Sequence, residues 1–207
     1  MPAWRIALLL LAGVAYAGAS HWMMLYHPAA PWAVVVLLAP LWLTAMGLAG
    51  QYLGRAAVAV TAVAGLAGLA LVFSGHAGDP NPLYVLQHVG INAVLALWFG
   101  GTLRPGQLSL IGQFAQRIHA LTPDMRRYTA RVTAVWTAYF CAVCVLSLAV
   151  YGLRPFEDWS LFSNVVTPIG VGALFVGEYL VRYRLHPEFE RVRLIDAVRA
   201  FYAPAKQ

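Results

Sequence analysis

Long runs of hydrophobic residues without a charged side chain make up most of this chain. Several runs extend for roughly 18 to 23 residues, the length that a helix needs to cross the roughly 30 Å hydrocarbon layer of a bilayer. We expect six transmembrane helices, at about residues 6–26, 29–49, 56–74, 82–102, 130–152 and 159–181. Nothing of domain size lies outside these spans. The pattern predicts an all-α polytopic membrane protein, with a membrane domain over residues 1–185 and a tail over residues 186–207.

Two further segments are too polar to cross a membrane. The first covers about residues 106–121 and the second is the tail, residues 186–207. In each segment apolar residues recur at spacings of three and four, with glutamine or arginine beside them. This pattern is typical of a helix that lies along a membrane surface. We expect both segments to be amphipathic surface helices.

Positive charges divide unequally between the loops. The chain is 61% hydrophobic and 11% charged, with a net charge of +6. With six spans, thirteen of its fourteen Lys and Arg residues fall on one side of the membrane and only Arg154 falls on the other. Because positively charged loops stay in the cytoplasm, both termini are expected there. We exclude nucleic-acid binding, since the arginines cluster next to span ends, where they set orientation and meet lipid headgroups.

The first span has a second interpretation, as a signal peptide. Ala15, Tyr16 and Ala17 follow an apolar run and resemble a cleavage site. Cleavage would leave five spans with the same topology. We favour retention, because the apolar run continues past this point to Leu25 and only Arg5 precedes it.

Polar side chains inside spans are costly in lipid, so they usually face the bundle interior and often serve a function. In the fourth span Tyr84, His88 and Asn92 are spaced four apart and share one helix face. In the sixth span Asn164 and Thr167 lie at a similar depth. We expect these five residues to line a ligand pocket or a transport path, or else to join helices through hydrogen bonds.

Other candidate groups in the spans favour structural roles. Glu178 is the only acid well inside a span, and Arg182 follows it by one helical turn, which predicts a structural ion pair. Cys141 and Cys144 in the fifth span are expected to pack as small apolar residues. Because a zinc site needs more ligands than these two residues, we expect no metal and no cofactor.

His119 and Asp124 form an H-x-x-x-x-D pattern on the cytoplasmic side. This spacing is similar to the acyltransferase motif of glycerolipid synthesis, in which the acid orients a histidine base toward a hydroxyl group. The α/β domain that carries the motif in those enzymes is missing, and Pro123 interrupts the geometry. Catalysis by His119 is therefore the weaker hypothesis.

Four short runs carry a resemblance to a known family. They are residues 106–119, 127–133, 159–164 and 177–179. Together they resemble a poorly characterised family of bacterial inner-membrane proteins, often encoded among aryl-polyene or related fatty-acid-synthase-like pigment pathways. The resemblance implies a bacterial inner membrane with acyl carrier proteins and other acyl-processing enzymes on its cytoplasmic face.

These observations favour a non-enzymatic accessory protein. It would hold or pass an acyl-lipid or polyene intermediate, or anchor cytoplasmic acyl-processing enzymes. Acyl carrier proteins are acidic, so a basic surface would steer them toward the membrane. The expected contact residues are Arg117, Arg126, Arg127 and Arg131. Membrane lipids are further expected partners, and self-association into a homo-oligomer is a further possibility. The alternatives are a membrane-bound acyltransferase that uses His119 and a small transporter that uses the polar face of the fourth span.

Overall fold

The computed structural model describes most of the chain as helix. It covers residues 3–27, 30–48, 50, 54–75, 78–117 and 120–185. The helices are α1 (Ala3–Tyr26), α2 (Pro31–Leu48), α3 (Arg55–Phe73), α4 (Asn81–Gly101), α5 (Leu110–Gln116), α6 (Pro123–Leu153), α7 (Phe156–Leu161), the π-helical segment η2 (Phe162–Val166) and α8 (Thr167–Leu185). Over these residues there is no strand, so the predicted all-α class is confirmed. His119 and the predicted tail helix lie outside the described residues.

Within the described residues, four helices are long and apolar enough to cross a membrane. They are Arg55–Phe73, Asn81–Gly101, Pro123–Leu153 and the continuous run Phe156–Arg182 through α7, η2 and α8. These four coincide with the third, fourth, fifth and sixth predicted spans. The helix α6 has 31 residues and is therefore roughly 46 Å long. Because the hydrocarbon layer is only about 30 Å thick, α6 must project beyond it.

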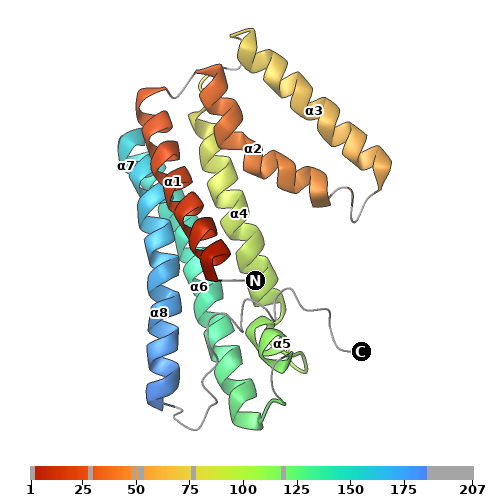
Figure 1. Cartoon of the computed structure of the whole chain (residues 1–207), viewed down its shortest axis with the longest axis vertical. Helices are drawn as coiled ribbons and strands as arrows, with labels where there is room; N and C mark the ends of the chain where they lie inside the picture. Colours follow the sequence, from red (N-terminus) through yellow and green to blue (C-terminus); the bar gives the residue numbers. More distant parts are fainter. Residues whose placement is uncertain are drawn as a thin grey trace.

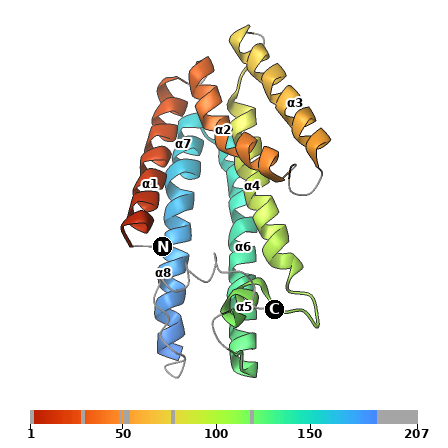
Figure 2. The ribbon, with the colours of Figure 1, turned by 45° about the vertical axis from the view of Figure 1, so that its right-hand side comes forward.

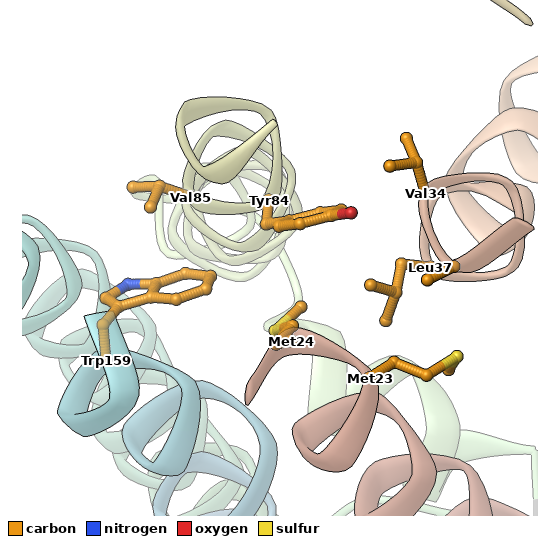
Figure 3. Close-up of a cluster of buried hydrophobic side chains, with 8 residues drawn as sticks. Met23, Met24, Val34, Leu37, Tyr84, Val85 and Trp159 are labelled. Carbon is orange, nitrogen blue, oxygen red and sulfur yellow. The ribbon is translucent and has the colours of Figure 1, made fainter. Parts of the chain in front are cut away.

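The helices α1, α4, α6 and α8 run side by side as an elongated bundle (Figures 1 and 2). Its two ends differ: one carries α7 and the other carries α5 (Figure 1), and they are called the α7 end and the α5 end. Toward the α5 end Ala96 of α4 packs with Trp136 and Phe140 of α6. At the α7 end, side chains from four helices meet (Figure 3), and they are Met23, Met24, Val34, Leu37, Tyr84, Val85 and Trp159.

The helices α2 and α3 form an arm that leans away from this bundle (Figures 1 and 2). The helix α2 contains Pro40 and bends along its length (Figure 1), as expected where proline removes a backbone hydrogen bond. None of the described side chains of α3 is buried. It packs against α2 at Gly65, where a side chain would collide with the indole ring of Trp42. The end of α2 and the start of α3 lie well short of the α5 end in both views (Figures 1 and 2).

Candidate functional site

Ser147 is the centre of a buried group of polar side chains at the α7 end. It lies on α6 and is 0% exposed. The indole Nε1 of Trp159 donates a hydrogen bond to Ser147 Oγ at 2.9 Å, and Nδ1 of His88 on α4 lies 3.1 Å from the same oxygen. The His88 ring stands edge-on to the rings of Trp159 and Phe162. Three helices therefore meet at one hydroxyl group.

Ser160 forms a second centre one residue after Trp159. It is also 0% exposed, and its Oγ lies 2.8 Å from Nδ1 of His21 on α1. The amide nitrogen of Asn164 donates to the Ser160 carbonyl at 3.0 Å and to the Met24 sulfur at 3.3 Å. These two centres, built on Ser147 and Ser160, are called the Ser147–Ser160 network. The network joins α1, α4 and α6 to α7 and η2, the two segments that lead into α8.

The hydrogen bonds of this network join helices to one another. An indole nitrogen donates a hydrogen bond and cannot accept one, so Trp159 cannot pass a proton from one centre to the other. Both serine side chains are fully buried. His88 Nε2 is buried and has no hydrogen-bond partner among the described residues.

The five predicted ligand residues do not converge on one cavity. Tyr84 extends from α4 toward α2 (Figure 3), whereas His88 bonds to α6. The Asn92 amide donates to the His88 carbonyl of its own helix at 2.8 Å. Asn164 belongs to the Ser160 centre. Thr167 alone of the five lines a described hollow, which has about 160 Å³ and apolar walls between α6 and α8. Ligand binding by these residues stays a prediction.

Two side-chain hydrogen bonds accompany the π-helical segment η2. Thr167 Oγ1 donates to the Phe162 carbonyl five residues earlier, at 3.0 Å. The Tyr139 hydroxyl on α6 donates to the Thr167 carbonyl at 2.6 Å. Gly170 lets this tyrosine approach, because a Cβ there would lie 2.7 Å from the hydroxyl oxygen. A side chain from a neighbouring helix thus bonds to the first carbonyl after the widened turn.

The α5 end contains a short helix fixed on α6 by hydroxyl groups. Thr133 Oγ1 accepts from the Ile111 nitrogen at 3.3 Å, and Thr102 Oγ1 accepts from the Leu110 nitrogen at 2.9 Å. The Ser109 side chain caps the helix by accepting from the Gly112 nitrogen. The helix α5 has seven residues, fewer than the predicted range of 106–121. It packs directly on α6 through the half-buried Ile111.

Four exposed arginines lie at the end of this short helix and in the first turns of α6. They are Arg117, Arg126, Arg127 and Arg131, all of them exposed, and together they are called the arginine surface. Arg127 makes a 3.7 Å ion pair with Asp124, in which both side chains are more than 70% exposed. Such exposed pairs contribute only about 0–1 kcal/mol. The positive charge of the arginine surface is therefore largely available to an external partner.

A hollow of about 290 Å³ separates α5 from the end of α4. It is lined by Trp98, Leu110, Gln113, Phe114 and Arg117 and is called the Trp98 hollow. The guanidinium carbon of Arg117 lies 5.3 Å from the centre of the Phe114 ring, within the range of a cation–π contact. The hollow thus combines a cation, an amide and an apolar wall.

The expected ion pair between Glu178 and Arg182 is present. Arg182 Nε donates to Glu178 Oε1 at 2.7 Å, and both side chains are less than one third exposed. The Tyr128 hydroxyl on α6 donates to the same carboxylate oxygen at 3.2 Å. The pair therefore also links α8 to α6. Farther along α6, the Cys144 thiol donates to the Val89 carbonyl of α4, whereas Cys141 is exposed.

Reasoning from the sequence missed most of the Ser147–Ser160 network. One available signal was that Ser147 is a lone hydroxyl in an apolar run. The roles of His21 and Met24 had no signal, because their partner Ser160 lies more than 130 residues away along the chain. Trp98 was likewise visible only as one apolar residue near the end of a span.

No group of three or more His, Cys, Asp or Glu side chains that could hold a metal occurs within the described part of the chain. Comparisons of the chain with family models, with curated proteins and with solved structures found no match. The geometry of the bundle ends therefore carries the functional argument.

Proposed function

We propose that this protein is a non-enzymatic accessory protein of the bacterial inner membrane that anchors acidic acyl-processing partners, such as acyl carrier proteins, at its cytoplasmic face. The arginine surface is the observation that supports this function most directly. Its four cations are exposed on α6 and at the end of α5, and α5 is itself fixed to α6. A fixed display of positive charge suits a partner that is steered by electrostatics and bound transiently.

The proposal includes a six-span topology with both ends in the cytoplasm. It adds α1 and α2 to the four long apolar helices. The α1 helix has 24 residues, enough to cross a bilayer. The uneven distribution of arginine supports the orientation. In this arrangement the α5 end faces the cytoplasm and the α7 end faces outward.

The orientation can be tested by labelling single cysteines from outside the cell with a membrane-impermeant maleimide. Cysteine in place of Ser74, at the outer end of α3, should be labelled in intact cells. Cysteine in place of Arg126 should react only after the membrane is opened. The background is the double variant Cys141→Ala, Cys144→Ala, which removes both native thiols. Labelling of the Arg126 position in intact cells would reverse the proposed topology.

The anchoring function can be tested by reversing charge on the arginine surface. In Arg126→Glu, Arg127→Glu, co-purification of an acyl carrier protein from the native host should be lost at moderate salt. The matched control is Arg154→Glu at the α7 end, where the arginine pairs with Asp158 and no cytoplasmic partner is expected. Equal recovery of the acidic partner from the double variant and the parent protein would refute the anchoring function.

A further inference from the structure

We infer that the Trp98 hollow is a binding site for one anionic phospholipid of the cytoplasmic leaflet, with a hydroxyl-bearing head such as glycerol. In this arrangement the Arg117 guanidinium binds the phosphate, and the Gln113 amide oxygen accepts from a head hydroxyl group. This goes beyond anchoring a protein partner, since it assigns a small-molecule ligand to a hollow that shares only Arg117 with the arginine surface; the choice of leaflet rests on the proposed topology.

The charge of Arg117 is directed to this site. Its guanidinium is held over the Phe114 ring, and no acidic side chain among the described residues pairs with it. The acids of the three described ion pairs, Asp124, Asp158 and Glu178, are each bound to a different arginine. A guanidinium donates two parallel hydrogen bonds that match a phosphate group.

The amide of Gln113 distinguishes between anionic headgroups. Its nitrogen donates to the Leu108 carbonyl at 2.8 Å. This bond orients a side chain that lines the hollow, and the amide oxygen is the atom of that side chain that can accept a hydrogen bond. An acceptor beside a cation suits a head that carries both a phosphate and a hydroxyl donor. A choline head has neither a net negative charge nor a donor hydroxyl, so the same site should bind it poorly.

The size and position of the hollow fit a lipid head together with the start of its chain. Its volume of about 290 Å³ is at the lower limit of pockets that enclose a whole small molecule, roughly 300–1,000 Å³. The rest of the acyl chain must therefore lie outside the hollow. Val94, Leu97 and Trp98 are all exposed and follow one another along one face of α4. They provide an apolar track that begins at the hollow.

Native mass spectrometry of the full chain in mild detergent tests this assignment. Phosphatidylglycerol and phosphatidylcholine with identical acyl chains are added in turn. The parent protein should retain one phosphatidylglycerol and little phosphatidylcholine. The variant Arg117→Gln should bind phosphatidylglycerol about tenfold more weakly or worse, because a charge-assisted hydrogen bond is lost. The variant Trp98→Ala should weaken binding of the same lipid by a smaller factor.

Arg131→Gln is the matched control, because Arg131 is exposed on α6 but does not line the hollow. It should keep full phosphatidylglycerol binding. Equal binding of both lipids, unchanged binding by Arg117→Gln, or an equal loss in Arg131→Gln would each overturn the lipid site. Displacement of the lipid by inorganic phosphate alone would also overturn it in favour of a plain anion site. The variant Arg126→Glu, Arg127→Glu should keep the lipid, so this inference and the anchoring function can fail separately.

Discussion

Ser147 and Arg126 lie on the same helix, α6, in opposite surroundings. Ser147 is completely buried and bonds to two other helices, whereas Arg126 is exposed near the first turn. The same contrast separates the two bundle ends. Polar groups at the α7 end are used within the molecule, and cations at the α5 end remain available outside it. A polar residue in a membrane protein is therefore a functional candidate only after its internal partners have been assigned.

Replacing Trp159 by alanine should produce the largest change. The indole is only 1% exposed and fills the space between α1, α4 and α6, so its loss leaves a cavity and also removes the bond to Ser147. We expect the free energy of unfolding to fall by about 3–5 kcal/mol, measured by denaturant titration in micelles with circular dichroism. Trp22→Ala, at an exposed indole, should change it by less than half as much. Similar losses in both variants would contradict the importance of the α7 end.

Ser147→Ala should have a smaller effect on the same measurement. The change leaves the Trp159 nitrogen and the His88 nitrogen without the hydroxyl that both contact. Burying polar groups without partners costs about 1–3 kcal/mol. The control is Thr61→Ala on α3, whose hydroxyl bonds only within its own helix among the described contacts. A Ser147 variant as stable as the control would show that the network does not stabilise the bundle.

Removing the charge of Glu178 should lower the free energy of unfolding by roughly 1 kcal/mol. A hydrogen bond between membrane helices contributes about 0.6 kcal/mol on average, and two bonds to this carboxylate are weakened. Glu178→Gln weakens the bonds to Arg182 and to Tyr128. The matched pair is Arg154 and Asp158, which has the same spacing but lies in an exposed position. Asp158→Asn should therefore leave the unfolding curve unchanged. A larger loss in Asp158→Asn than in Glu178→Gln would reverse the proposed ranking.

Charge reversal at Arg126 and Arg127 should have the smallest effect on folding. Both side chains are exposed, and exposed substitutions usually change stability by less than about 0.5 kcal/mol. We expect an unfolding curve that matches the parent protein together with lost recovery of the partner. This result would show that the α5 end serves partner binding, whereas the α7 end serves stability. A large loss of stability would instead show that these arginines support the fold.

The sequence predicted the long apolar helices because a bilayer imposes a minimum length on each of them. The pair Glu178 and Arg182 was predictable for a similar reason, since both residues lie on one helix at a fixed spacing. The start of α5 was predicted less well. The predicted range begins at residue 106, but Gly106 and Gln107 lie in a turn before the helix, which Gly106 supports with its positive φ of 81°.

Contacts between distant segments could not be predicted in this way. The five polar residues of the fourth and sixth spans were expected to share a site, because they lie at similar depth. In the structure, the direction of each side chain depends on how its helix is rotated in the bundle. Tyr84 consequently meets α2 (Figure 3), while His88 meets α6. Depth follows from the sequence pattern, but rotation depends on the packing of all neighbouring helices.

The π-helical segment η2 sets the rotational phase of α8. An α-helix turns by about 100° per residue, and a π-helical turn contains one more residue than an α-helical turn. Deleting one residue between 162 and 166 would therefore turn α8 by roughly 100° relative to α7. Glu178 would leave the side of the helix that meets Tyr128. Phe175, whose ring centre lies 4.8 Å from that of Trp136 on α6, would lose this contact. A five-residue segment at one end of the bundle thus fixes the angular position of every α8 side chain at the other end.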